Sequence, residues 1–189
     1  MKSNILEQLW LTEVAEWDIP GVTRAQAEQH IQACLICMDC HNHNTGIQLT
    51  VLDDKTTDTI QLNWIGGVDE HIRRGWRDLQ EATEYGATAI AILLVIKRTK
   101  YTILERAMKD TGFDYWLIEE ENFDEEDLFP EGSARLEVSG IIHAKNNSEI
   151  QRRVREKLKQ TQVSDKKGLP AIIVVAEFSR PEARVAYKL

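Results

Sequence analysis

The sequence predicts an α/β domain whose core runs, in chain order, as a helix, a three-strand meander, a second helix and a final strand. Small and apolar residues recur at helical spacing from Trp76 to about Lys97, which is typical of a mostly buried helix. Residues 171–178 (AIIVVAEF) are apolar at nearly every position, as in a strand covered on both faces. A length of 189 residues suits one large domain, or one domain with a small appendage.

The N-terminal part, residues 1–72, is expected to pack on this core, to which we assign residues 73–189. Its first 20 residues predict a short amphipathic helix that ends near Pro20. The apolar anchors of that helix would be Ile5, Leu9, Trp10 and Trp17.

A second helix and a β-hairpin are predicted to follow. Thr23 is a candidate N-cap for a helix that runs to about Cys40. Two alternating segments come next, residues 47–51 (IQLTV) and 59–64 (TIQLNW), and the turn-rich DDKTTD separates them. Alternation on both sides of such a turn indicates a hairpin.

The core meander is predicted from three short segments, residues 101–107, 113–117 and 134–140. The turn KDTG joins the first two segments into a hairpin. Asn147 or Ser148 is then placed to cap a basic helix that runs to about Gln162.

Two carboxylates within the meander are candidate site residues. Asp114 begins the second segment and Glu137 lies in the third. If the two strands pair antiparallel with these residues opposite, their Cβ atoms lie roughly 5 Å apart on one face. A slip of one residue would send the side chains to opposite faces. In the correct register the pair needs a cation, a shared proton or a basic partner, and Mg²⁺ is one ion that accepts carboxylate ligands.

A plainer interpretation of the same residues stays open. Carboxylates on the surface of strands are common. Asp114 would then cap the turn before it, and Glu137 would pair with Arg135 or Arg106.

The order of elements from Trp76 to Phe178, with Asp114 at the start of the second strand and Glu137 on the third, resembles the PD-(D/E)xK restriction-endonuclease-like superfamily. The resemblance implies a restriction-endonuclease-like core in which these two acids bind Mg²⁺. An upstream helix often adds a glutamate in that family, and here the candidate is Glu84 or Glu81.

The sequence departs from the family motif at two positions. Phe113 stands in place of the proline, and Ser139 stands in place of the lysine two residues after the second acid. A hydroxyl cannot supply positive charge. The cation would therefore have to come from the following helix, for which Arg153 and Lys157 are the candidates.

The function implied by the resemblance is Mg²⁺-dependent hydrolysis of phosphodiester bonds in nucleic acid, with a catalytic set of Asp114, Glu137, Ser139 and Lys157. One alternative is a catalytically inactive member of the same fold that acts as a protein- or DNA-binding component. Another is a plain α/β interaction protein, for example a homodimer.

The net charge of −8 argues at first against a nucleic-acid partner, but the charge is uneven. Residues 119–127 hold seven acids, and the remainder of the chain sums to −1. Residues 151–167 carry a net charge of +5. A basic helix is compatible with phosphate binding and is also typical of a solvated face. The candidate nucleic-acid contacts are Arg152, Arg153, Arg155 and Lys159.

Cys34, Cys37, Cys40 and His41 lie close together and suggest a zinc cluster. Their spacing fits a helix better, in which Cys34, Cys37 and His41 fall on one face, so we expect these to be core residues. An odd, clustered set of cysteines does not indicate a disulfide framework. No apolar leader precedes the first helix, and the strongly apolar run at residues 89–96 is too short to span a bilayer. We therefore expect a cytoplasmic protein without a membrane partner.

Overall fold

The computed structural model describes residues 6–124, 133–162 and 168–188. The strands are β1 (Glu7–Trp10), β2 (Ile47–Leu52), β3 (Thr57–Asn63), β4 (Tyr101–Arg106), β5 (Tyr115–Glu119), β6 (Ala134–Ile141), β7 (Ala171–Glu177) and β8 (Glu182–Lys188). The helices are α1 (Arg24–Asp39), α2 (Glu70–Gly75), α3 (Leu79–Arg98) and α4 (Asn147–Gln160), with 3-10 turns η1 (Leu11–Ala15) and η2 (Glu120–Asn122).

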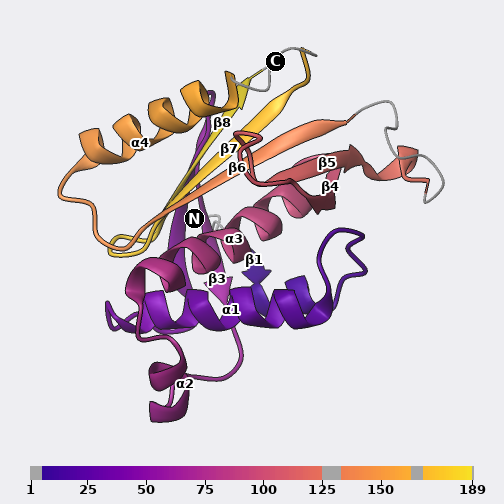
Figure 1. Ribbon diagram of the computed structural model, residues 1–189. Coiled ribbons are helices and arrows are strands. Elements are labelled where there is room, and N and C mark those ends of the chain that lie inside the picture. Colours follow the sequence, from indigo (N-terminus) through magenta and orange to yellow (C-terminus); the bar gives the residue numbers. More distant parts are fainter. Residues whose placement is uncertain (1–5, 125–132, 163–167, 189) are drawn as a thin grey trace, which may run out of the picture.

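All of these strands belong to one mixed sheet, in the order β1-β3-β2-β8-β7-β6-β5-β4. Helices α1 and α3 lie on one side of the sheet and α4 lies on the other (Figure 1). The predicted α/β class is therefore confirmed, and so is the order helix, three strands, helix, strand from α3 to β7.

The central strands are the ones that the apolar pattern predicted. Strand β7 is buried along its whole length and lies between β6, to which it is parallel, and β8, to which it is antiparallel. Helix α4 makes the crossover between the two parallel strands. Strand β8 was not predicted, and it joins the N-terminal hairpin β2–β3 to the core sheet by pairing with β2.

The predicted helix over residues 1–20 is wrong for the part that the structure describes. Glu7–Trp10 is an extended strand that pairs parallel with β3, and η1 follows it. The side chains of Leu9 and Leu11 are buried whereas Trp10 is exposed. This alternation suits a sheet edge, and the open edge of β3 outweighs the local helical tendency. Ile5 lies outside the described residues.

The second predicted helix and the hairpin after it are confirmed. Thr23 caps α1 in a reciprocal capping box with Gln26, in which each side chain accepts a hydrogen bond from the other residue's backbone N–H. Cys34 and Cys37 are buried in α1, as expected of core residues, whereas Cys40 is exposed. The hairpin forms as β2 and β3.

Helix α3 is the central element on its side of the sheet. Asp78 caps its first turn through hydrogen bonds from the backbone N–H groups of Gln80 and Glu81, so it begins at Leu79 and not at Trp76. The described part of the chain has one helix long and apolar enough to cross a membrane, and it is α3. This helix is mostly buried between α1 and the sheet, as a core helix is.

Helix α4 begins one residue after Asn146, whose side chain accepts a hydrogen bond from Glu149 N. The cap is therefore neither Asn147 nor Ser148. Part of the acidic stretch, residues 125–127, lies outside the described residues.

Candidate functional site

The β5–β6 pairing has the register that brings the two acids together. Tyr115 lies opposite Leu136 and Trp116 lies opposite Arg135. Asp114 directly precedes β5 and Glu137 directly follows Leu136, so the two acids are neighbours at the end of this pairing. Asp114 N donates at 2.9 Å to the carbonyl oxygen of Leu136, the residue that also pairs with Tyr115.

The Asp114 carboxylate is fixed against β6. Its Oδ2 accepts a hydrogen bond of 2.7 Å from Val138 N, one residue after Glu137. The side chain therefore reaches across to the third strand of the meander. It does not cap the preceding turn, as the plainer interpretation would have it.

Glu137 is buried, with 1% of its surface exposed. Its Oε1 lies 2.5 Å from Lys157 Nζ of α4, so its basic partner is neither Arg135 nor Arg106. Its other oxygen, Oε2, is buried and has no hydrogen-bond partner among the residues that the structure describes. Burial and the neighbouring charge of Asp114 raise the pKa of Glu137 to about 7, because together they outweigh the effect of Lys157.

Ser139 takes its hydrogen bond from a second cation of α4. Arg153 Nη1 donates to Ser139 Oγ at 2.9 Å. Arg153 and Lys157 are four residues apart and so share one face of the helix. The two cations that the sequence offered in place of the motif lysine thus both reach the strand that carries Glu137.

The apolar face of α4 sets this arrangement. Ile150 is fully buried, and Val154 and Leu158 pack with it against the face of β7 that carries Ile173 and Val175. With the helix docked along these residues, the adjacent face carrying Arg153 and Lys157 is held toward Glu137 and Ser139.

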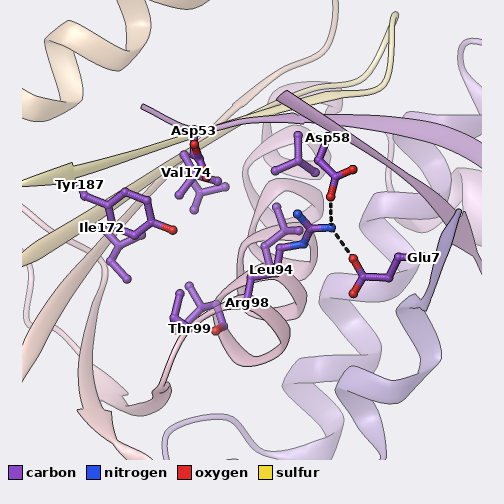
Figure 2. A pocket seen from close by; sticks show the side chains of 12 residues that line it. Glu7, Asp53, Asp58, Leu94, Arg98, Thr99, Ile172, Val174 and Tyr187 are labelled. Carbon is purple, nitrogen blue, oxygen red and sulfur yellow. Dashed lines mark hydrogen bonds and ion pairs between the residues drawn. The ribbon is translucent and has the colours of Figure 1, made fainter. Parts of the chain in front are cut away.

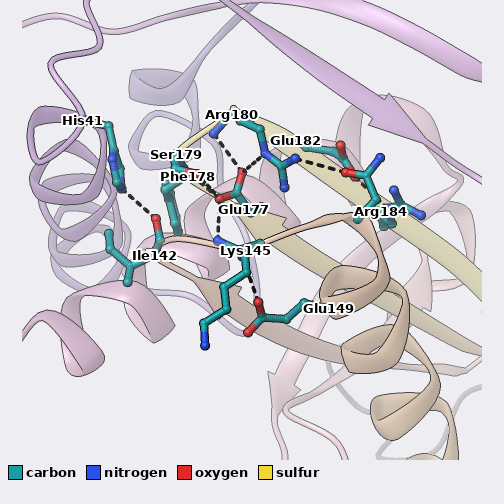
Figure 3. A network of polar contacts seen from close by, with 12 residues as sticks. His41, Ile142, Lys145, Glu149, Glu177, Phe178, Ser179, Arg180, Glu182 and Arg184 are labelled. Atoms are coloured by element: carbon teal, nitrogen blue, oxygen red, sulfur yellow. Dashed lines mark hydrogen bonds and ion pairs between the residues drawn. The ribbon is translucent and has the colours of Figure 1, made fainter.

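A buried carboxylate secures the loops at the start of α4 (Figure 3). Glu177 at the end of β7 is fully buried and accepts hydrogen bonds from the backbone N–H groups of Ala144, Ser179 and Arg180, at 3.0, 3.1 and 2.8 Å. Burial raises the pKa of Glu177, but the hydrogen bond from the Ser179 hydroxyl, together with these backbone bonds, holds it below its usual value. His41 Nε2 lies 2.7 Å from Ile142 O and ties the same loop to the end of α1.

Asp114 lines a pocket of about 700 Å³ at the edge of β6, and Glu137 is not among the residues that line it. Residues of α1, α3, β4, β6 and α4 line it together with the segment around Asp114. Its polar and charged lining includes His30, Thr83, Glu84, Arg106, Asp114, Ser139, His143, Arg153 and Lys157.

The predicted helix acid and the basic residues fall in different places. Glu84 is exposed on α3 and lines the pocket, whereas Glu81 does not. Of the four basic residues proposed as nucleic-acid contacts, Arg153 lines the pocket. The other three are exposed elsewhere on α4: Arg152, Arg155 and Lys159.

A second pocket, of about 370 Å³, lies at the other end of α3 (Figure 2). Its one basic lining residue among those described is Arg98. Arg98 Nη2 contacts the carboxylates of both Glu7 and Asp58, the latter at 2.9 Å. With its cation already paired twice, this pocket is a poorer candidate for binding an anion than the pocket at β6.

Several polar residues of the pocket at β6 were not predicted as site residues, among them His30 of α1 and Arg106 of β4. These two lie far from the motif in the sequence, and no spacing rule links them to it. The lowered pKa of His30, about 4, is caused first by burial and then by the positive charge of Arg106.

Comparison of the chain with protein-family models, with curated proteins and with solved structures finds no match.

Proposed function

We propose that this chain is a divalent-metal-dependent, nuclease-like protein with a restriction-endonuclease-like core, which hydrolyses phosphodiester bonds in nucleic acid. One observation carries the proposal: the Asp114 carboxylate is bound by Val138 N, one residue after Glu137, and Lys157 Nζ lies 2.5 Å from Glu137 Oε1. An acid pair with an adjacent ammonium is the chemistry that the resembled motif uses.

The residues at the pair suit a hard divalent cation. Glu137 Oε2 is a buried oxygen without a hydrogen-bond partner in the described chain, and the pKa of this carboxyl is raised to about 7. A bound cation would give the unpartnered oxygen a ligand contact and would stabilise the ionised form of the carboxyl. Asp114 and Glu137 would hold the ion; Glu84 lines the pocket, but within the described chain it is not placed to complete a group of three ligands with them. When bound, such an ion polarises the phosphodiester and lowers the pKa of a bound water.

The two cations of α4 are suited to contact the phosphate of the substrate. Lys157 supplies at Nζ the positive charge that Ser139 lacks. Arg153, held by Ser139 Oγ, adds a guanidinium suited to paired hydrogen bonds with phosphate oxygens. In this proposal the charge of the motif lysine has moved from the strand to the facing helix.

A cleavage assay tests the proposal. Single- and double-stranded DNA and RNA are incubated with Mg²⁺ or Mn²⁺ and compared with samples in EDTA. Asp114→Asn and Glu137→Gln should abolish cleavage. The matched control Glu28→Gln alters an exposed acid of α1 that pairs with Arg24 and should cleave like the wild type. Metal-dependent cleavage that survives Glu137→Gln would refute the proposal.

A second candidate is a binding component of the same fold without catalysis. The described residues contain no group of three or more His, Cys, Asp or Glu side chains placed to hold a metal ion. Lys157 also neutralises Glu137 without any metal. Nucleic-acid binding that is the same in EDTA and in Mg²⁺, without cleavage, would favour this candidate.

A further inference from the structure

Strand β4 contains a bulge that decides which charge faces the pocket. Ile103 lies opposite Leu117, but after the bulge Glu105 lies opposite Trp116 and Arg106 lies opposite Tyr115. Residues directly opposite each other in an antiparallel pair share a face of the sheet. Without the extra residue, Glu105 would take the place opposite Tyr115. The bulge therefore exchanges an acid for an arginine beside the pocket.

The loop before α1 braces this bulge. Gly21 N donates to Ile103 O at 2.9 Å. A Cβ atom at Gly21 would lie 2.6 Å from Glu105 N, a distance that side chains do not tolerate. The absence of a side chain thus lets the loop pack directly on the bulged backbone, so the position of Arg106 is built into the fold.

Arg106 itself has an unpaired charge. Its side chain is exposed and lines the pocket together with Tyr115 and Asp114. It forms no ion pair or hydrogen bond within the described part of the chain. Burial lowers the pKa of His30 to about 4, and the positive charge of Arg106 adds to this effect; burial raises the pKa of Tyr115 to about 12, and the charge of Arg106 opposes that rise.

Arg106 and the acid pair approach the pocket from different faces of the sheet. Arg106 shares a face with Tyr115, which pairs with Leu136, whereas Glu137, the next residue of β6, points to Lys157 of α4. The pocket lies at the edge of β6, and Arg106, Asp114, Arg153 and Lys157 all line it. Three cations along one pocket suit a chain of several phosphates better than a single one.

We propose that Arg106 binds a phosphate of the nucleic-acid strand next to the phosphodiester held at Asp114 and Glu137. The substrate is then a strand with at least two consecutive phosphates. This inference rests on the proposed function, because it takes the acid pair as the position of the reacting phosphodiester.

Binding measured without cleavage tests the role of Arg106. Fluorescence anisotropy is recorded for labelled single-stranded and duplex DNA and RNA in EDTA and in Ca²⁺, over a range of salt concentrations. Arg106→Gln should weaken binding several-fold and reduce the slope of log K against log salt by about one. Arg106→Lys should restore most of the slope, since it restores the charge.

Two matched controls separate a phosphate contact from a general loss of charge. Arg24→Gln removes an exposed arginine outside the pocket, and Glu105→Gln alters the neighbour that does not share the face of Tyr115. Both should keep the wild-type slope. In competition, a 5′-phosphorylated dinucleotide should displace the probe better than a mononucleotide from the wild type, and Arg106→Gln should lose this preference.

The outcomes distinguish this inference from the proposed function. An unchanged salt slope in Arg106→Gln, with a wild type that binds and cleaves, overturns the role of Arg106 alone. The expected slope change in a protein that never cleaves supports the phosphate contact and overturns hydrolysis. A wild type that binds none of the four nucleic acids overturns the role of Arg106, and the cleavage assay then decides hydrolysis separately.

Discussion

Lys157 satisfies only one of the two carboxylate oxygens of Glu137. Its Nζ lies 2.5 Å from Oε1, while Oε2 is buried without a hydrogen-bond partner among the described residues. Ionisation of a carboxylate buried in this way destabilises the folded state, because a single ammonium does not replace its full hydration. Glu137 therefore links the stability of the fold to pH and, if the proposed function holds, also to divalent cations.

The stability of a Glu137→Gln variant should depend on pH in a definite direction. The folded-state pKa of Glu137, about 7, lies above its usual value of 4.5. The contribution of the protonated form to stability is complete below pH 4.5 and is lost as pH rises toward 7. Gln resembles that form at every pH. The variant should match the wild type at pH 4.5 and be more stable at pH 8, by at most about 3 kcal/mol.

Chemical denaturation at the two pH values, without metal, measures this difference. A divalent cation supplies the control, because Mg²⁺ or Mn²⁺ at pH 8 should stabilise the wild type and leave Glu137→Gln unchanged. Equal stability of the two proteins at pH 8 would mean that Glu137 is not strained in the folded state.

Lys157→Met should remove catalysis while keeping the helix docked. Methionine keeps the aliphatic stem and removes the charge, so we expect cleavage to fall by about 10²-fold or more. Lys159→Met is the matched control, since Lys159 is exposed and does not line the pocket. Single-turnover rates are compared below the melting temperature of the less stable variant. Equal rates for the Lys157 variant and the wild type would remove Lys157 from the site.

The acid pair was predictable from sequence because its determinants are local. The short turn between the first two strands and the lengths of the second and third strands leave few registers, and the observed one pairs Tyr115, the residue after Asp114, with Leu136, the residue before Glu137. A polar or acidic side chain on otherwise apolar strand segments then stands out. The same logic identified Arg153 and Lys157 as the cations of the following helix.

The features that escaped prediction depend on contacts distant in sequence. Glu7–Trp10 became a strand because β3 presents an open edge to it. The bulge that turns Arg106 toward the pocket is braced by Gly21, some eighty residues upstream. His30 enters the pocket wall only because α1 packs on α3. No periodicity within one segment carries this information.

His30 should make the fold sensitive to acid. It is 5% exposed, and burial with the nearby charge of Arg106 lowers its pKa from 6.5 to about 4. The neutral form contributes stability above pH 6.5 that is lost as pH falls toward 4. His30→Leu should remove this dependence, which amounts to at most about 3 kcal/mol.

Urea denaturation between pH 4 and pH 7 gives the measurement for His30. His71→Leu alters an exposed histidine, so its free energy of unfolding should depend on pH as that of the wild type does. If the free energy of unfolding of His30→Leu depended on pH as strongly as that of the wild type, the acid sensitivity would belong to other groups. Because Glu137 acts in the opposite direction over much of this range, the double variant with Glu137→Gln separates the two contributions.

Gly140→Ala should damage the pocket by forcing two of its walls apart. A Cβ atom at Gly140 would lie 2.2 Å from Thr83 O and 2.6 Å from Thr83 Cγ2, so α3 would have to move away from β6. Overpacking of this kind costs about 1–3 kcal/mol, and more when backbone has to shift. Thr83 and Gly140 both line the pocket, so catalysis and metal binding should fall together with stability.

Gly67→Ala is the control for this substitution, since a Cβ at Gly67 meets nothing within 4 Å and the free energy of unfolding should change little. Thermal denaturation gives the stability of each variant, and calorimetric titration with Mn²⁺ reports on the acid pair. If Gly140→Ala were as stable as the wild type and bound Mn²⁺ equally well, the close packing of α3 on β6 would not be what positions the acids. The expected joint loss would instead show that the site depends on the distance between that helix and that strand, since neither residue carries a reactive group.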